Sequence, residues 1–468
     1  MRGSTQACGR LARAVPLGAL AALISGVAHA AAPAAAPALL AHQAALELDP
    51  AASAWILTST ALVLMMTVPG LALFYGGIVR KKNVLATLGQ ALAASLLVTI
   101  LWFVAGYSLA FGTNGDPGLN RFIGSFDSLF LNGVGANTAW AGAPGLPETL
   151  WVAYQLTFAI ITPALIAGAF AERIKFSGFL LFIGLWHLIV YAPVCHWVWS
   201  GGFLGGMGVL DFAGGAVVHV NSGVAGLVAA LFLGRRVGLG RDNMAPHNLT
   251  LTVIGAALLW VGWIGFNAGS AWAPDAIAAQ ALLGTIVATA AAGAAWAAAE
   301  WIERRKPTVL GMVSGAVAGL VAITTAAGFV NSQGAFFIGV AGGLVCWFAV
   351  VWVKRWLRYD DTLDVFGIHG VGGLVGALLT GVFADAAVNG LAEGATVWNQ
   401  AVGLVAVIAW SGVATWAILW ICKLTTGLRV SEEEERQGLD LTQHGEAVHD
   451  ALGGGGSPPP RRGGFGWG

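Results

Sequence analysis

Charged side chains are scarce in this 468-residue chain, and their scarcity decides the class of protein. Only 10% of the residues are Asp, Glu, Lys or Arg, whereas 57% are hydrophobic. Soluble domains carry about 25% charged residues, so a soluble globular domain is excluded. Lys and Arg together number 23, as do Asp and Glu. The balanced charge gives no reason to expect nucleic acid as a partner.

Cysteine is rare as well. The four cysteines lie far apart, and none belongs to a CxxC pair or to a Cys/His cluster: Cys8, Cys195, Cys346 and Cys422. This spacing indicates neither a disulfide framework nor a metal site. Free cysteines commonly serve as small apolar packing residues, and we expect no metal and no cofactor.

Long apolar runs are what the chain has instead. A helix of about 20 residues crosses a bilayer and satisfies its own backbone hydrogen bonds there. The sequence therefore predicts an all-α polytopic membrane protein, and its 67 glycines fit close helix packing in lipid. Eleven transmembrane helices are expected, at residues 54–77, 84–112, 149–172, 176–200, 215–234, 246–268, 272–301, 308–330, 334–358, 368–388 and 397–422.

The N-terminus has the features of a targeting signal. Basic residues precede a short apolar stretch, and Ala28-His29-Ala30 has the form of a signal-peptidase site. We predict a signal peptide at 1–30, a periplasmic segment at 31–53, the membrane domain at 54–424 and a cytoplasmic tail at 425–468. An uncleaved extra helix is the competing interpretation, but Pro16 and the short apolar run argue against it. The Gly/Pro-rich end of the tail has the composition of a disordered segment.

Basic residues predict the orientation, because they favour the cytoplasmic side. If the first span runs from outside to inside, Arg121 is the only Lys or Arg residue in the predicted outer loops. The N-terminus is then outside and the C-terminus inside. The inner side collects Arg80, Lys81, Lys82, Arg173, Lys175, Arg235, Arg236, Arg241, Arg304, Arg305, Lys306, Lys354, Arg355, Arg358, Lys423, Arg429 and Arg436.

Two histidines on similar apolar backgrounds indicate an internal repeat. His219 precedes VNSGVAGLVAAL, and His369 precedes GVGGLVGALL. The first and sixth spans also match, with VPGLALFYGG and VGWIGFNAGS. Five spans per half, plus a final helix, make the second half insert upside down, as in many transporters. A lone buried histidine could simply bond a backbone carbonyl, but two at equivalent positions suggest a pathway. A metal site would need further ligands, and none lies near them in the sequence.

Several long stretches resemble the ammonium transporter (Amt/Rh) family, in its bacterial Amt form. They include ALVLMMTVPGLALFYGGIVRKKNVL, GAFAERIKFSGFL, LDFAGGAVVHVNSGVAGLV, PHNLTLTVIGAALLWVGWIGFNAGSA, DVFGIHGVGGLVGALLTG and TGLRVSEEEERQGLD. The resemblance runs from about residue 61 to residue 444. It implies a homotrimer with one conducting pathway in each subunit, located in the cell inner membrane. A membrane-embedded enzyme is not expected, because the sequence contains no nucleophile–base arrangement and no metal cluster.

The resemblance also implies roles for individual residues. Twin pore histidines that share a hydrogen bond match His219 and His369. Tyr154 stands where the family often has phenylalanine, and the added hydroxyl leaves its effect on affinity open. The outer ammonium recruitment site matches Tyr154, Trp199 and Ser270, and the stacked pair that closes the pore matches Phe158 and Phe266.

Two nearby residues allow more than one role. Asp211 could bind the ammonium ion directly, but tight charge pairing would also hold sodium and potassium. The family assigns this position a structural and electrostatic role, which we expect here. Trp263 lies three residues before Phe266, on the same helix face, and is expected to form pore wall.

The resemblance therefore implies an ammonium transporter. NH4+ would be recruited at the outer aromatic site and deprotonated near the phenylalanine gate, and NH3 would pass the histidines, with the proton relayed separately or not at all. The rivals are an ammonium sensor with little transport and a neutral NH3/CO2 channel of the Rh type. Sensors usually have an extra C-terminal domain, and a neutral gas has little use for a cation site. The tail resembles one that docks a PII-type nitrogen regulator, with Asp364 as a candidate contact.

Overall fold

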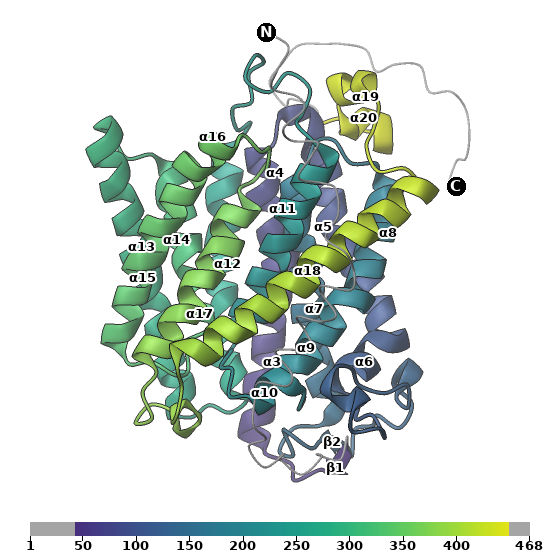
Figure 1. Cartoon of the computed structure of the whole chain (residues 1–468), viewed down its shortest axis with the longest axis vertical. Helices are drawn as coiled ribbons and strands as arrows, with labels where there is room; N and C mark the ends of the chain where they lie inside the picture. The colour runs from purple at the N-terminus through teal and green to yellow at the C-terminus, as the bar shows by residue number, and fades with distance from the viewer. Residues whose placement is uncertain (1–42, 449–468) are drawn as a thin grey trace.

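The chain is built almost entirely from helices (Figure 1). The computed structural model describes residues 43–448. The predicted signal peptide, residues 1–30, and the Gly/Pro-rich end of the tail lie outside the described residues. In the described part, two short strands form an antiparallel pair, β1 (Gln43–Ala45) and β2 (Thr138–Trp140).

Ten helical segments within residues 43–448 are long and apolar enough to cross a membrane. Each corresponds to a predicted span, with ends that differ by a few residues. The predicted span 308–330 corresponds to α14 (Val309–Thr324), which has only 16 residues because turns follow it. The ten segments are Pro50–Ile78, Lys81–Phe111, Glu148–Phe170, Phe176–Gly206, Gly215–Leu233, Leu249–Ala271, Ala276–Arg304, Ser332–Leu357, Phe366–Phe383 and Val397–Thr425.

Wide π-type turns occur in six of these segments: they interrupt four, which therefore contain more than one regular helix, and they begin the other two. These turns are Met66–Leu71, Trp102–Gly106, His187–Tyr191, Gly215–Val220, Ala349–Val353 and Phe366–Gly370. The regular helices are α3 (Pro50–Met65), α4 (Ala72–Ile78), α5 (Val84–Leu101), α6 (Tyr107–Phe111), α7 (Glu148–Phe170), α8 (Phe176–Trp186), α9 (Ala192–Trp199), α10 (Phe203–Gly206), α11 (Asn221–Leu233), α12 (Leu249–Asn267), α13 (Ala276–Arg304), α15 (Ser332–Phe348), α16 (Lys354–Leu357), α17 (Val371–Phe383), α18 (Val397–Thr425), α19 (Glu432–Gln437) and α20 (Leu439–His444).

Short polar side chains start several of the spanning helices. Asp49 accepts hydrogen bonds from the amides of Ala51 and Ala52 at 2.9 and 3.0 Å, and Thr308 accepts one from Gly311 at 2.8 Å. Such caps satisfy amides that have no partner within the helix. Side-chain oxygens cap the first turn in the same way at Asn248, Asp275, Asn331 and Thr396.

Spans from the two predicted halves pack against each other. Helix α12 lies along α3 and α4, so the sixth span contacts the first. The turn before α11 contacts α17, and α11 contacts the turn before α17, so the fifth span contacts the tenth. Figure 1 shows α18 running diagonally across the bundle, with the β1–β2 pair below and α16, α19 and α20 above. We call the end with the β1–β2 pair the hairpin end, and the end with α16, α19 and α20 the basic end.

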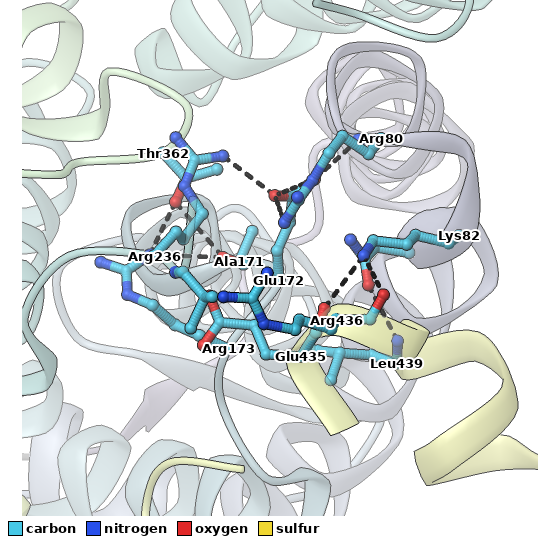
Figure 2. Close-up of polar contacts among 12 residues, drawn as sticks. Arg80, Lys82, Ala171, Glu172, Arg173, Arg236, Thr362, Glu435, Arg436 and Leu439 are labelled. Atoms are coloured by element: carbon cyan, nitrogen blue, oxygen red, sulfur yellow. Dashed lines mark hydrogen bonds and ion pairs between the residues drawn. The ribbon is translucent and has the colours of Figure 1, made fainter. Parts of the chain in front are cut away.

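A buried network of charges joins the helices at the basic end (Figure 2). The Glu172 carboxylate contacts the guanidinium groups of Arg80, at 2.8 Å, and Arg236, at 3.0 Å. Arg236 also contacts the carboxylate of Asp360 at 2.9 Å. Arg173 donates to the carbonyl of Asp360 at 2.6 Å. The network therefore joins the ends of the first, third and fifth spans to the loop before the tenth.

The start of the tail packs on this end of the bundle. Helix α19 begins with a capping box formed by Ser431 and Glu434. Glu435 accepts hydrogen bonds from the amide of Val237 at 2.6 Å and from Arg429 at 2.7 Å. Asp440 accepts one from the amide of Ala86 at 2.8 Å. Residues 425–444 therefore pack against the helix bundle and do not form a freely solvated tail.

The network lowers the pKa of its two carboxyl groups. Burial raises the pKa of Asp360, but the hydrogen bonds and charge of Arg236 outweigh burial and lower this pKa to about 2. Burial likewise raises the pKa of Glu172, and the charges of Arg236 and Arg80 lower it below its usual value. A carboxyl group with a depressed folded-state pKa stabilises the fold above its unfolded pKa of about 3.9. That contribution is lost as the pH falls through the folded-state pKa.

We expect Asp360→Asn to lower the Tm of the detergent-solubilised protein at pH 7, because Arg236 would lose its buried charged partner. Removing one partner of a buried pair costs about 3–5 kcal/mol. The Tm difference from wild type should shrink below about pH 4 and be mostly lost near pH 2, where half of the native carboxylate is protonated. Glu303→Gln, at an exposed site on α13, is the control and should leave Tm unchanged. A difference that stays constant down to about pH 2 would contradict this account.

Candidate functional site

Two buried histidines lie at the centre of the bundle, each on a wide turn. His219 belongs to the turn Gly215–Val220 and His369 to the turn Phe366–Gly370. Their Nδ1 atoms are 3.2 Å apart, and their rings are nearly parallel with centroids 5.2 Å apart. In such a pair one Nδ1 donates and the other accepts. Nε2 of His219 is buried and has no hydrogen-bond partner among the described residues.

Glycines allow the two histidine-bearing helices to touch. Gly223 lies one turn after His219, and a Cβ atom there would overlap with the backbone of Gly370. Gly370 is the neighbour of His369 in the sequence. The contact between these two backbones thus fixes the distance between the histidines, and any larger residue at Gly223 would separate them.

Aromatic rings cover the histidine pair on the side of the hairpin end. The rings of Phe158 and Phe266 stack with centroids 4.2 Å apart. The Phe266 ring lies 6.1 Å from the His219 ring. Trp263 stacks on His219 at 5.3 Å, and its Nε1 donates to the hydroxyl of Thr324 at 2.8 Å. The indole is thereby fixed as one wall beside the histidine.

Trp199 and Ser270 lie closer to the hairpin end. Trp199 meets Phe158 edge-on at 5.9 Å, and its Nε1 donates to the carbonyl of Asp211 at 2.8 Å. Ser270 donates to the carbonyl of Phe266 at 2.8 Å. Both side chains are partly exposed, so an ion from that side reaches them before it reaches the stacked phenylalanines.

Tyr154 has a different environment from these two residues. Its side chain is 0% exposed, and its hydroxyl lies 3.0 Å from the carbonyl of Gly265 and 3.3 Å from the hydroxyl of Ser270. The ring packs edge-on against Phe158 at 5.1 Å. The hydroxyl therefore holds the end of α12 and the serine in place.

Asp211 uses both carboxylate oxygens on the backbone. Oδ1 accepts hydrogen bonds from the amides of Gly214 and Gly215 at 2.8 and 2.6 Å. Oδ2 accepts from those of Ala216 and Val217, both at 2.9 Å. These are the free amides at the start of the turn that carries His219, so the carboxylate caps that turn.

A second carboxylate has the matching position in the other half, and our sequence analysis missed it. Asp361 precedes His369 by eight residues, just as Asp211 precedes His219. Its Oδ2 accepts a hydrogen bond from the amide of Phe366 at 2.8 Å, and its Oδ1 has no partner within residues 43–448. Burial raises the pKa of Asp361 to about 6, against the opposing charge of Lys354. The equal spacing in the two halves was a signal that could have identified it.

Asp364, the candidate contact for a regulator, forms an ion pair with Lys354 at 2.5 Å. Both side chains are partly exposed at the basic end. The buried Glu172–Arg236–Asp360 network was also missed, because its members are far apart in the sequence. In the part of the chain that the structure describes, no three His, Cys, Asp or Glu residues are grouped to hold a metal ion.

The arrangement thus places an aromatic face and a hydroxyl toward the hairpin end, stacked rings behind them, and a buried pair of imidazoles beyond. Aromatic faces attract cations by about 0.5–2 kcal/mol. The stacked phenylalanines lie between these outer groups and the histidines. Imidazole rings in hydrogen-bond contact can accept and donate protons.

Known proteins share this architecture. The Ammonium Transporter Family matches residues 54–449. An ammonium transporter of Aquifex aeolicus is 48% identical over 416 residues, 88% of this chain and 96% of that protein. The crystal structure of Saccharomyces cerevisiae Mep2 is similar with a TM-score of 0.76 at 38% identity, over 83% of this chain and 89% of that one. A structure described as a sensor Amt protein has a TM-score of 0.77 at 27% identity, over 84% of this chain and 98% of that one. The chain thus belongs to the ammonium transporter family.

Proposed function

We propose that this protein carries ammonium across the membrane by separating the ion into NH3 and a proton. The observation that carries the proposal is the buried pair His219 and His369, with Nδ1 atoms 3.2 Å apart, below the stacked rings of Phe158 and Phe266. Trp199, Ser270 and Tyr154 form the recruitment site for NH4+ at the hairpin end. NH3 then passes along the histidines to the basic end.

The outer site binds NH4+ only weakly. The indole face of Trp199 supplies a cation–π attraction, and the Ser270 hydroxyl oxygen accepts a hydrogen bond from the ion. Tyr154 adds the ring wall, and its hydroxyl orients Ser270. None of these groups carries a full charge, so the ion can leave as readily as it binds.

Selectivity against potassium follows from deprotonation. K+ and NH4+ have the same charge and similar size, so a cage of oxygens separates them poorly. Burying a charge in an apolar site costs far more than burying a neutral molecule. NH4+ can lose its proton before the apolar segment, whereas K+ remains charged and is excluded.

The histidine pair supports passage in its neutral form. One ring donates its Nδ1–H to the other, and Nε2 of His219 has no partner in the described chain. That nitrogen is available to NH3 or to a proton. Trp263 stacks on the ring and keeps it in this orientation.

We also propose the topology, the assembly and the regulation that are typical of the ammonium transporter family. The topology includes eleven spans in a 5+5 inverted repeat with a final helix, the N-terminus outside, the C-terminus inside, and a cleaved signal peptide. The assembly is a homotrimer in the inner membrane, with one pathway per subunit. A PII-type regulator docks at the basic end, near Asp364. The packing of the first span on the sixth and of the fifth on the tenth supports the repeat.

A sensor is the second candidate function, because a sensor Amt protein has a similar fold. One observation favours transport: the identity is 48% with the Aquifex transporter and 27% with the sensor structure. A neutral-gas channel of the Rh type would need no cation site, so Trp199 and Ser270 argue against it.

The first test removes the histidines. Wild-type protein on a solid-supported membrane should give a current after an ammonium pulse and none after a potassium pulse. His219→Ala combined with His369→Ala should abolish the current, because the proton loses its route. His247→Ala, two residues before the helical segment Leu249–Ala271, should leave the current unchanged. Absence of a wild-type current with continued NH3 uptake, read from internal pH, would contradict an electrogenic mechanism.

The second test separates the roles of the outer residues. Trp199→Leu should raise the half-saturating ammonium concentration about 2- to 30-fold, which corresponds to the loss of one cation–π contact. Tyr154→Phe should change this concentration by less than about threefold. It should instead lower the stability by about 1 kcal/mol, because the hydrogen bond to Gly265 is lost. Equal affinity losses in both variants would refute this division of roles.

The third test addresses Asp211. Asparagine has one acceptor oxygen, so Asp211→Asn would leave two of the four amides facing an NH2 group. Each unsatisfied buried group costs about 1–3 kcal/mol, so we expect a lower Tm and a lower maximal rate. A normal Tm with only a raised half-saturating concentration would indicate direct ion binding instead. Both quantities can be measured on the same preparation.

A further inference from the structure

The outer residues of the pathway form a series of contacting pairs between α7 and the end of α12. The innermost pair is Phe158 and Phe266, whose rings stack at 4.2 Å. The next pair is Tyr154 and Ser270, whose hydroxyl oxygens are 3.3 Å apart. Trp151 lies nearly one turn before Tyr154 on α7, and positions three or four residues apart share one face of a helix. The aromatic face of α7 therefore continues outward from the stacked phenylalanines to Trp151.

Trp272 forms a third pair with Trp151. The two rings meet edge-on, with centroids 5.0 Å apart. Trp272 follows the short 3-10 helix Ala268–Ala271 and comes two residues after Ser270. Its side chain is partly exposed. The two elements that supply the inner pairs thus also bring a tryptophan to the mouth of the pathway.

A buried stack of two tryptophans holds the Trp272 indole in place. Trp140 stacks on Trp151 with centroids 4.7 Å apart and meets Trp272 edge-on at 6.2 Å. Trp140 is 5% exposed and Trp151 is 1% exposed. Trp140 belongs to β2, where it pairs with Gln43 of β1, and a Cβ atom at Gly142 would overlap with its ring. The β1–β2 pair therefore helps to fix the position of Trp272.

The backbone of Trp272 has a conformation that tryptophan rarely adopts. Its φ angle is 65°, in the left-handed region that glycine enters freely and bulky residues avoid. Many helices end with a residue in this conformation, which is usually glycine. A tryptophan at such a position adds backbone strain. The indole must therefore contribute something that a glycine would not.

An interfacial aromatic belt is the simpler interpretation, since tryptophans gather at both surfaces of a membrane. Trp398, at the start of α18, has the exposure typical of a belt residue, 75%. Trp140 and Trp151 are instead buried within the protein. Trp151 also shares its helix face with Tyr154. These tryptophans therefore belong to the pathway and not to the lipid-facing surface.

We propose that Trp272 is a cation-binding residue at the mouth of the pathway. An ammonium ion contacts its indole through a cation–π interaction and moves from there to Trp199 and Ser270. This role rests on the proposed transport of ammonium and adds a binding residue to it. Trp140 and Trp151 are positioning residues, which hold the indole without contacting the ion.

The test measures how the ammonium-induced current of the full chain on a solid-supported membrane depends on ammonium concentration. Trp272→Leu removes the aromatic face, and Trp272→Phe retains a smaller one. Trp398→Leu is the matched control at another exposed tryptophan. Broadening of the ammonium NMR signal by the same proteins reports binding without transport. Thermal unfolding verifies that each variant is folded.

We expect Trp272→Leu to raise the half-saturating ammonium concentration about 2- to 5-fold, which corresponds to the loss of one cation–π contact at an exposed site. It should also broaden the ammonium signal less than wild type does. The maximal current should be unchanged, because only binding outside the gate is lost. Trp272→Phe should have a smaller effect than Trp272→Leu, and Trp398→Leu should have none.

Three outcomes would overturn the proposal: a lower maximal current with an unchanged half-saturating concentration, equal effects of Trp272→Leu and Trp398→Leu, or equal broadening of the ammonium signal by wild type and Trp272→Leu. A wild-type protein that gives no current would contradict the proposed transport instead. The NMR comparison then decides the role of Trp272 by itself, and an absence of broadening by wild type would also overturn that role.

Discussion

The cost of leaving a polar group unsatisfied inside a membrane protein governs the pathway of this one. Between Trp199 and His369, several buried polar groups have partners within the described chain. The Asp211 carboxylate accepts hydrogen bonds from four backbone amides. The indole N–H of Trp263 donates one to the hydroxyl of Thr324. Nε2 of His219, by contrast, is buried without a hydrogen-bond partner in residues 43–448. An unpaired buried nitrogen is costly, and in the proposed mechanism the passing solute supplies the missing hydrogen bond.

The same cost of leaving buried groups without partners also determines where the charged side chains lie. The buried network of ion pairs lies at the basic end, where Glu172, Arg236 and Asp360 neutralise one another and join distant helix ends. The capping carboxylates Asp211 and Asp361 face backbone amides instead. Each of them precedes its histidine by eight residues, so each half begins its histidine turn in the same way. The asymmetry lies in Asp361, whose second oxygen is unpartnered and close to the positive charge of Lys354.

Most of the fold could be predicted from the sequence, because apolar runs and basic loops are local signals. The ten spans, their approximate ends and the pairing of His219 with His369 follow from the residue pattern together with the family resemblance. The wide turns could not be predicted, since no residue type specifies them, nor could the buried network of Arg80, Glu172 and Asp360, which joins positions far apart in the chain. The family resemblance placed Tyr154 at the outer site, but its burial depends on the carbonyl of Gly265, which no sequence pattern reveals.

The saturated carboxylate of Asp211 explains how the outer site can attract a cation without holding it. A free carboxylate at this point would bind every small cation, and release would limit the rate. Because four amides occupy the oxygens, the negative charge acts only through space, and the contacts left to the ion are an aromatic face and a hydroxyl. Those contacts amount to a few kcal/mol at most. Such a site concentrates ions and rejects none of them, so discrimination must occur at the next step. In the proposed mechanism, that step takes place at the stacked rings of Phe158 and Phe266, which admit only a solute that has given up its charge.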